Sequence, residues 1–245
     1  MKFYRRLKPF KAISFDLDDT LYSNRPIMLS IDTKMATYFT NRIPTPNDKR
    51  LFDSQFWWLY RQQALTHNHF LIHDVVALRL ESYSLGFKSL GFSPADAKRE
   101  AQVALNYFTS LRSNFTVAPR VHHLLASLQK KWPLVAISNG NVDTQAIGLS
   151  QYFSATFHAG RQTEKNAELH YRQKPHHDMF VAACNELSIK PEELLHVGDC
   201  GRSDIFGAHS AGCQSVWLSC FEVGKPLSIL PNIELSDVVE LHGLI

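Results

Sequence analysis

The chain has few of the features that mark membrane or secreted proteins. No apolar run reaches the roughly 18 residues of a membrane-spanning helix, so we expect no membrane partner. The basic opening MKFYRRLKPFK is not followed by a long apolar stretch, which argues against a signal peptide. Cys184, Cys200, Cys213 and Cys220 form no CxxC pair, which is typical of reduced thiols. We therefore expect a cytoplasmic protein.

The chain also lacks a strong net charge, internal repeats and low-complexity tracts. Its 245 residues carry a net charge of +3 without a basic helix face, so nucleic acid is not an expected partner. The hydrophobic content of 44% is ordinary for a globular protein. A chain of this length can form one large domain or a core domain with an insertion. We expect a monomer or a weak dimer.

Four short apolar runs have the composition of strands that are buried on both faces of a parallel sheet. They are Ala12–Phe15, Leu134–Ile137, Leu194–Val197 and Ser215–Leu218. Helical patterns lie between the last three runs, including one that starts at Pro175. Strands that alternate with helices favour a parallel sheet with right-handed crossovers. The predicted fold class is therefore α/β, a Rossmann-like sheet with helices on both faces.

The region between the first two strand candidates is unusually long. It contains more than a hundred residues, most of them with helical patterns. One helix should begin after Ser93, a capping residue, with Pro94 in its first turn. We interpret this block as an inserted helical cap domain over residues 23–116. The core domain is then formed by residues 1–22 and 117–245.

The first strand candidate leads directly into three closely spaced carboxylates. Asp16, Asp18 and Asp19 lie within the stretch FDLDDTLYS. Neighbouring carboxylates repel one another unless a cation or a shared proton offsets their charge. Ligands of open parallel sheets bind beyond the carboxyl ends of the strands, where residues 138–140 and Asp199 are also expected. Asp16 and Asp199 could together supply the hard oxygen ligands that Mg²⁺ prefers.

These residues predict phosphoryl transfer. Asp16 can attack a phosphate once a metal ion has reduced the repulsion, which gives an aspartyl-phosphate. Asp18 can protonate the leaving oxygen and later accept a proton from water. Ser138 and free backbone N–H groups around Asn139 and Gly140 can bind phosphate oxygens. Lys174, at the start of the predicted helix, can neutralise charge on the transferred group.

The same residues resemble the motifs of the haloacid dehalogenase (HAD) superfamily of phosphatases. The family pattern DxDxT, Ser/Thr, Lys and GDxxxxD corresponds here to DLDDT, SNG, KP and GDCGRSD. The resemblance implies a HAD-like core with a helical cap and a Mg²⁺ cofactor. It implies Asp16 as the nucleophile, Asp18 as the acid and base, and Asp204 as a residue that orients a metal-bound water or Lys174. The implied metal ligands are Asp16, Asp18 through its carbonyl, and Asp199. The implied phosphate-binding residues are Asp16, Leu17, Asp18, Ser138, Asn139 and Lys174.

Three longer stretches are similar to one bacterial branch of this family. They are FDLDDTLYSNRP, KKWPLVAISNGN and ELLHVGD. That branch is linked to the dephosphorylation of 5-amino-6-(5-phospho-D-ribitylamino)uracil, a riboflavin precursor, and of flavin mononucleotide (FMN). The resemblance thus implies a small phosphorylated metabolite of riboflavin biosynthesis as the substrate. The segment between Gly160 and Lys174 is longer than in that branch, which affects the setting of Lys174 and the substrate entrance.

Other interpretations of individual motifs are open. An EF-hand calcium loop would need Gly and Glu at its sixth and twelfth positions, where the chain has Leu21 and Ile27. Histidines 67, 69 and 73 have a spacing found in zinc sites, but no Cys or carboxylate cluster is near them. Asp19 is more easily explained as a helix or turn cap. Lys165 and Arg172 compete with Lys174 for the role of the catalytic lysine.

Three functions fit these motifs. The first is a Mg²⁺-dependent phosphomonoesterase. The second is a phosphomutase, a sugar-phosphate phosphatase or a dehalogenase on the same scaffold, although dehalogenases of this family lack the carboxylate of Asp18. The third is a regulator that binds a phosphorylated metabolite without catalysis. Trp57 and Trp58 are more easily core residues than ligand contacts, yet with Arg61 they offer aromatic faces and a cation that suit a heteroaromatic phosphate.

Overall fold

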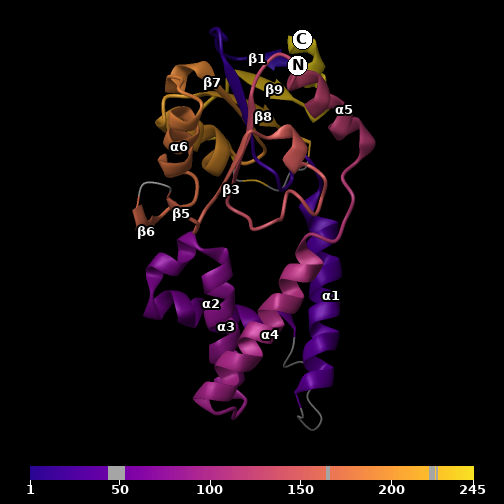
Figure 1. Cartoon of the computed structure of the whole chain (residues 1–245), viewed down its shortest axis with the longest axis vertical. Helices are drawn as coiled ribbons and strands as arrows, with labels where there is room; N and C mark the ends of the chain where they lie inside the picture. Colours follow the sequence, from indigo (N-terminus) through magenta and orange to yellow (C-terminus); the bar gives the residue numbers. More distant parts are fainter. Residues whose placement is uncertain (44–52, 164–165, 221–223, 225) are drawn as a thin grey trace. The chain divides into compact units, whose positions relative to one another are not determined.

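The computed structural model describes residues 1–43, 53–163, 166–220, 224 and 226–245. The chain divides into two compact units, which we call the core and the cap (Figure 1). The core consists of Met1–Asn24 and Thr116–Ile245, and the cap consists of Arg25–Phe115. None of the described helices is long and apolar enough to cross a membrane.

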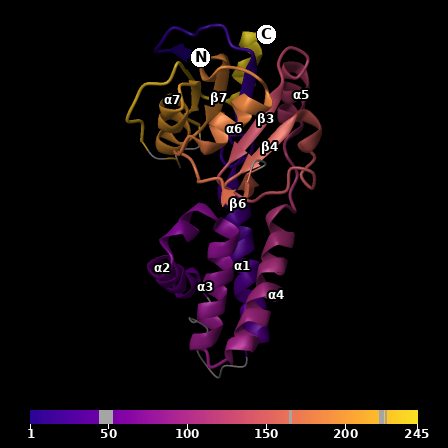
Figure 2. The same ribbon diagram turned by 60° about the vertical axis from the view of Figure 1, so that its left-hand side comes forward.

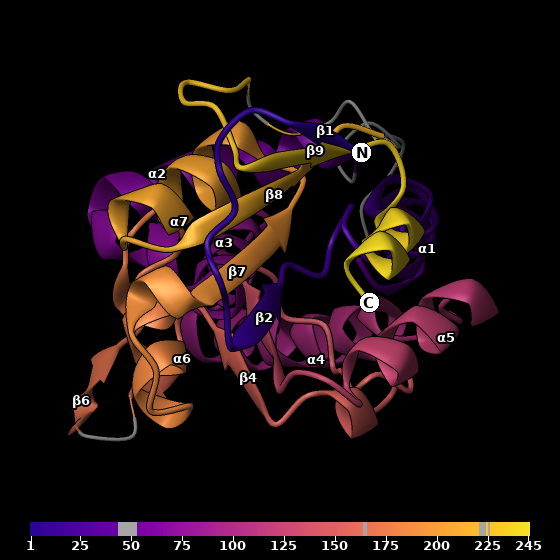
Figure 3. The ribbon, with the colours of Figure 1, turned by 90° about the horizontal axis from the view of Figure 1, so that it is seen from above.

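A seven-stranded sheet forms the centre of the core (Figure 3). Its strand order is β1–β9–β8–β7–β2–β3–β4, and every neighbouring pair is parallel except β1 and β9. The strands are β1 (Lys2–Phe3), β2 (Ala12–Phe15), β3 (Leu134–Ser138), β4 (Ala155–His158), β7 (Leu194–Gly198), β8 (Gln214–Leu218) and β9 (Ile233–Leu235). The four predicted strands are thus confirmed as β2, β3, β7 and β8, and the mostly parallel α/β sheet is confirmed with them.

The central strands have apolar sequences because both of their faces are covered. Every residue of β2, β3 and β7 is buried, so these strands show no alternation of polar and apolar residues. In the ladder, Phe15 of β2 lies beside Val197 of β7 and Ala136 of β3. This register places the chain after all three strands at the same edge of the sheet.

Helices cover both faces of this sheet. Helices α6 and α7 lie on one face, and α5 lies on the other (Figure 3). The α-helices of the core are α5 (Pro119–Leu128), α6 (Asp178–Glu186) and α7 (Gly207–Ser210). The 3₁₀ helices are η3 (Ser150–Tyr152), η4 (Pro191–Glu193) and η6 (Val238–Leu244), and η5 (Gly201–Phe206) is a π-helix.

Helix α6 begins later than its sequence predicts. The expected start was Pro175, but the helix starts at Asp178. Residues 173–176 form a turn in which the N–H of His176 donates to the carbonyl of Gln173 (3.1 Å). Before this turn, the longer segment predicted from the sequence contains an antiparallel pair, β5 (Gln162–Thr163) and β6 (Asn166–His170).

The cap consists of helices. They are α1 (Asn24–Arg42), α2 (Ser54–His67), the 3₁₀ helix η2 (His69–His73), α3 (Val75–Ser89) and α4 (Pro94–Arg112). Helix α3 packs against both α2 and α4 (Figure 2). Capping residues explain where the last three α-helices begin, because the side chains of Asp53, Asp74 and Ser93 accept backbone N–H groups of the first turn. The start of α4 after Ser93 agrees with the prediction.

Aromatic rings form the centre of the cap. Phe39 is fully buried, and its ring centroid lies 4.2 Å from that of Trp57 and 5.4 Å from that of Tyr83. A Cβ atom on Gly86 would lie 2.4 Å from Cζ3 of Trp57, so this glycine makes room for the indole ring. Trp57 is therefore a packing residue, whereas 59% of the surface of Trp58 is exposed.

Candidate active site

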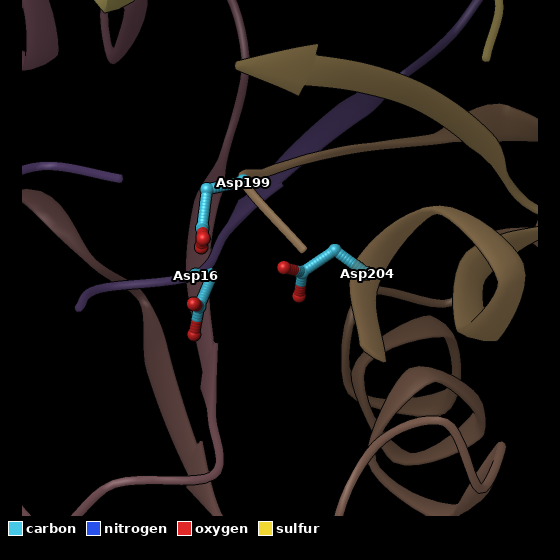
Figure 4. Close-up of side chains that lie close together, drawn as sticks. All are labelled: Asp16, Asp199 and Asp204. Atoms are coloured by element: carbon cyan, nitrogen blue, oxygen red, sulfur yellow. The ribbon is translucent and has the colours of Figure 1, made fainter. Parts of the chain in front are cut away.

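Two predicted metal ligands lie together at the carboxyl edge of the sheet. Asp16 follows β2 directly, and Asp199 follows β7, the neighbouring strand. The N–H of Asp16 donates to the carbonyl of Val197 (2.9 Å), which continues the ladder beyond the end of β2. The two carboxylates therefore lie close to each other, as Figure 4 shows. This juxtaposition follows from the register of two parallel strands.

The carboxylate of Asp204 reaches the same place from η5 (Figure 4). Its Oδ2 accepts the N–H of Cys200 (2.9 Å). A Cβ atom on Gly198 would lie 2.3 Å from Cγ of Asp204, so only glycine leaves room for the carboxylate at this position. The spacing of Gly198 and Asp204 in GDCGRSD therefore has a packing reason.

Lys174 joins two of these carboxylates. Its ammonium group donates to Oδ1 of Asp16 (2.8 Å), Oδ1 of Asp204 (2.7 Å) and the carbonyl of Ile137 (2.7 Å). Only 2% of the residue is exposed, so these three acceptors replace water around a buried charge. Asn139 holds the backbone of Lys174 from both sides, because its Oδ1 accepts the N–H (2.7 Å) and its Nδ2 donates to the carbonyl (3.0 Å).

Arg172, one of the alternative cations, has another partner. Arg172 forms a two-pronged ion pair with Asp178, at 2.8 and 2.7 Å, near the start of α6. Lys165 lies outside the described residues. Of the cations compared in the sequence, Lys174 is thus the one that the structure places against Asp16. The expected position of Lys174 at a helix N-terminus is wrong, because α6 starts four residues later.

The buried charges of this site do not balance. Burial raises the pKa of Asp16 to about 7 although Lys174 opposes the shift. Burial, followed by repulsion from Asp204 and Asp16, raises the pKa of Asp199 to about 8. Burial opposes the charges of Lys174 and Asp204 too, but their attraction raises the pKa of Lys174 and lowers that of Asp204. Lys174 and Asp204 therefore form an ion pair, while Asp16 and Asp199 need a further cation to ionise fully at neutral pH.

The carboxylates of Asp16 and Asp199 fit a magnesium ion, and Asp204 lies beside them. One carboxylate oxygen from each of Asp16, Asp199 and Asp204 lies within 4.8 Å of the others. Hard oxygen ligands with unbalanced negative charge are what Mg²⁺ binds. Within the part of the chain that the structure describes, no other cluster of His, Cys, Asp or Glu has metal-site spacing, so the histidine group of the cap gives no support for a zinc site. The carboxylate of Asp18 is not in the cluster, and its predicted contact is through its carbonyl.

Asp18 and Asp19 have different partners. The hydroxyl of Tyr22 donates to Oδ1 of Asp18 (2.8 Å), which holds this carboxylate beside the chain that leads into α1. Oδ1 of Asp19 accepts the N–H of Asn24 (2.8 Å), the first residue of α1. Asp19 also adopts a positive φ of 54°. The interpretation of Asp19 as a helix or turn cap is therefore confirmed.

The loop after β3 is organised by hydrogen bonds of its own. Ser138 is 1% exposed, and its Oγ accepts the N–H of Gly140 (3.0 Å). The Gly140 carbonyl in turn accepts Nδ1–H of His158 (2.9 Å), whose pKa burial lowers to about 4. The N–H of Gly140 is thus not free for a phosphate, contrary to the expectation from sequence. Leu17, the other backbone group expected at the phosphate, is fully buried.

Sequence reasoning missed two histidines of this region. His158 ends β4 beside Ser138, and His196 lies in the middle of β7. Both are buried, with 3% and 0% of their surfaces exposed. The signal for His196 was its place inside the otherwise apolar run LLHV, because a polar residue in a fully buried strand requires hydrogen-bond partners. The strand β4 that carries His158 was not predicted at all.

Comparison with known proteins agrees with this fold and site. The model of the haloacid dehalogenase-like hydrolase family matches residues 10–212, and the chain therefore belongs to this family. It is 35% identical, over the full length of both chains, to 5-amino-6-(5-phospho-D-ribitylamino)uracil phosphatase YigB of Escherichia coli K12. It is also 26% identical to the phosphoglycolate phosphatase of that strain, over 98% of this chain and 95% of the relative. The protein is thus a HAD-type phosphatase.

Solved structures show the same fold. A crystal structure of 2-haloacid dehalogenase from Pseudomonas syringae pv. Tomato DC3000 matches with a TM-score of 0.83 and 25% identity, over 96% of this chain and 97% of that one. The magnesium-bound HAD-hydrolase YfnB from Bacillus subtilis matches with a TM-score of 0.65 and 19% identity, over 97% and 99% of the two chains. The HAD-like fold with an inserted helical segment is thereby confirmed.

Proposed function

We propose that the protein is a Mg²⁺-dependent phosphomonoester hydrolase that works through an aspartyl-phosphate on Asp16. The observation that carries this proposal is the buried Asp16 carboxylate, with one oxygen held by Lys174 and with Asp199 beside it. A carboxylate fixed at one oxygen presents the other oxygen for attack in a defined direction.

The proposed reaction has two steps. In the first, a free oxygen of Asp16 attacks the phosphorus, the bond to the leaving oxygen breaks, and the carboxyl group of Asp18 gives that oxygen a proton. In the second, water attacks the phosphorus and gives a proton to the Asp18 carboxylate. The bond between phosphorus and Asp16 then breaks and inorganic phosphate leaves. The hydrogen bond from Tyr22 orients Asp18 for both proton transfers.

Chain residues would also hold the metal and the phosphate. Asp16, Asp199 and the carbonyl of Asp18 would bind Mg²⁺, which when bound supplies the positive charge that lets an anionic phosphate approach Asp16. We infer that Ser138, the backbone near Leu17 and Asn139, and Lys174 contact the phosphate oxygens. Lys174 already donates its three N–H groups to protein acceptors. Contact with a phosphate oxygen therefore requires one N–H group to be shared between a protein acceptor and the phosphate.

We further propose a heteroaromatic phosphate as the substrate, namely 5-amino-6-(5-phospho-D-ribitylamino)uracil or FMN. The full-length similarity to YigB supports this choice. The cap supports it too, with a cavity of about 270 Å³ whose lining includes Trp57, Trp58, Arg61 and Arg79. Aromatic faces and guanidinium groups favour flat, polar rings over bare sugars. Four free cysteines are consistent with our proposal that this metabolite is met in the cytoplasm.

The first experiment measures phosphate release from a panel of phosphomonoesters, with and without Mg²⁺. A hydrolase releases stoichiometric phosphate only with the metal. A phosphomutase moves the phosphoryl group without net release, and a binding regulator releases none. Either of the last two results would overturn the proposed hydrolysis.

The second experiment tests the substrate. We expect kcat/KM to be higher for the two heteroaromatic phosphates than for hexose and triose phosphates, and Trp58→Ala or Arg61→Ala to reduce this preference. Leu29→Ala is the matched control, because Leu29 is also 59% exposed on the cap but does not line the cavity. Trp57→Ala additionally removes a packing residue and needs a stability measurement beside it. If sugar phosphates are preferred, or the variants behave like the control, the substrate assignment is wrong while the phosphatase chemistry stands.

A further inference from the structure

His196 connects the catalytic groups to the interior of the sheet. It has no exposed surface, and the reaction proposed above does not use it. Its Nδ1 lies 2.9 Å from Oγ of Ser14, the residue beside it on β2, and its Nε2 lies 3.2 Å from Oδ1 of Asp204. The ring of Phe180 from α6 packs edge-on against the imidazole at 4.9 Å.

The partners of His196 select one tautomer. Burial lowers its pKa, so the ring is neutral and carries a single proton. Asp204 is held ionised by Lys174 and His196, and an ionised carboxylate only accepts hydrogen bonds. The proton of His196 is therefore on Nε2, where it is donated to Asp204. Nδ1 is then an acceptor, and the hydroxyl of Ser14 donates to it.

The hydrogen bond from His196 Nε2–H helps to hold the carboxylate of Asp204 in place. Oδ1 of Asp204 receives His196 Nε2–H and the ammonium group of Lys174, while Oδ2 receives the N–H of Cys200. Two of the donors precede Asp204 by eight and four residues, and Lys174 lies 30 positions away, so the carboxylate is held from more than one side and has one preferred orientation. Asp204 then fixes the ammonium of Lys174, which donates to Oδ1 of Asp16.

We propose that His196 is a positioning residue for phosphoryl transfer: through Asp204 it orients Lys174 against the nucleophile, and the hydroxyl of Ser14 donates to its other ring nitrogen. The proposal rests on Asp16 being the nucleophile. It assigns no contact with substrate to His196. The alternative is that His196 only fills space between β7 and α6, where Phe180 covers it.

Three substitutions separate positioning from packing. His196→Gln can place an amide N–H near the position of Nε2, His196→Asn can place one only near Nδ1, and His196→Leu has neither. We expect the Asn and Leu variants to lose about 10- to 100-fold in kcat, as for groups that orient catalytic side chains. We expect His196→Gln to stay within about threefold of the wild type, and KM to change less than kcat in all three. Circular dichroism and thermal unfolding give the folded fraction of each variant.

The outcomes are distinct. Recovery of kcat in His196→Gln alone supports the proposal. A kcat for His196→Leu near the wild-type value, or a loss in all three variants that equals their loss of folded protein, overturns it. An Asp16→Asn variant that still hydrolyses substrate would contradict the proposed nucleophile instead, so the two failures can be told apart.

A measurement without catalysis tests the tautomer. Long-range ¹H–¹⁵N correlation spectra of the histidine side chains distinguish a proton on Nε2 from one on Nδ1. We expect the Nε2–H form for His196 in the wild type and also in Ser14→Ala, because the ionised carboxylate of Asp204 still requires a donor. A proton on Nδ1 in the wild type would overturn the proposal, because Nε2 could then donate nothing to Asp204.

Discussion

The core and the cap bury different kinds of side chains. In the core, the buried groups include the ionised pair Lys174 and Asp204, the proposed nucleophile Asp16 and two histidines. In the cap, the buried cluster consists of apolar and aromatic residues around Phe39, and Arg112 is the one buried charge among the residues described there. Buried charges persist only when partners are arranged around them, whereas apolar packing requires shape alone. The buried groups of the core thus include charges suited to chemistry, whereas those of the cap mainly provide packing.

The largest effect that this contrast predicts is in the core. Asp16→Asn should reduce phosphate release by on the order of 10³-fold or more, because it removes the proposed nucleophile and a proposed metal ligand while keeping the side-chain volume. Initial rates of phosphate release with purified protein measure this loss, and circular dichroism checks that the fold is intact. Retention of more than about a few per cent of activity would contradict the covalent mechanism.

Removal of the metal should have the next largest effect. Exhaustive dialysis against EDTA should abolish turnover, and added Mg²⁺ should restore it, because Asp16 and Asp199 need a cation to ionise together. Turnover that persists after chelation would show that the carboxylate cluster has another role. A calcium titration is a useful control, since Ca²⁺ can occupy oxygen sites but accepts looser geometry.

In the cap, substitution of a buried residue should change stability rather than chemistry. Phe39→Ala removes a fully buried ring from the aromatic cluster, and we expect a loss of about 3–5 kcal/mol in the free energy of unfolding. Denaturant unfolding measures this change. Folded Phe39→Ala should still hydrolyse a small phosphomonoester in the presence of Mg²⁺. If its chemistry is lost as completely as in Asp16→Asn, the division of roles between core and cap is wrong.

The last expected effect is a pH dependence of the stability of the metal-free protein. The folded pKa of Asp199, about 8, lies above its unfolded value of 3.8, so its ionisation costs stability progressively as pH rises from about 4 to about 8. In EDTA, Asp199→Asn should therefore raise the unfolding temperature by an amount that grows over this range and then levels off. With Mg²⁺ present, the wild type should have the higher unfolding temperature, because the variant has lost a proposed metal ligand. If the difference in unfolding temperature does not depend on pH, the pKa of Asp199 is not raised in the folded protein.

Comparison of the strands shows which parts of the fold could be predicted. β2, β3, β7 and β8 were found because burial on both faces leaves mostly apolar residues in their sequences, even though each strand keeps at least one polar residue. β4 was missed, since half of its residues are only partly buried and it reads as ATFH, and β1 and β9 are too short for a pattern. The helix start after Ser93 was found because capping and proline preferences act locally.

By itself, the sequence determined the chemical groups of the site and the edge of the sheet at which they meet. Asp16 and Asp199 follow apolar strands, and any parallel pairing of these strands brings both to one edge. Only the tertiary structure decided how these groups are held. Asn139 binds the backbone of a residue 35 positions away, and Ser14 meets His196 across 182 positions. Such partners lie far apart in the chain, and their hydrogen bonds depend on the register of whole strands and helices, so no local pattern records them.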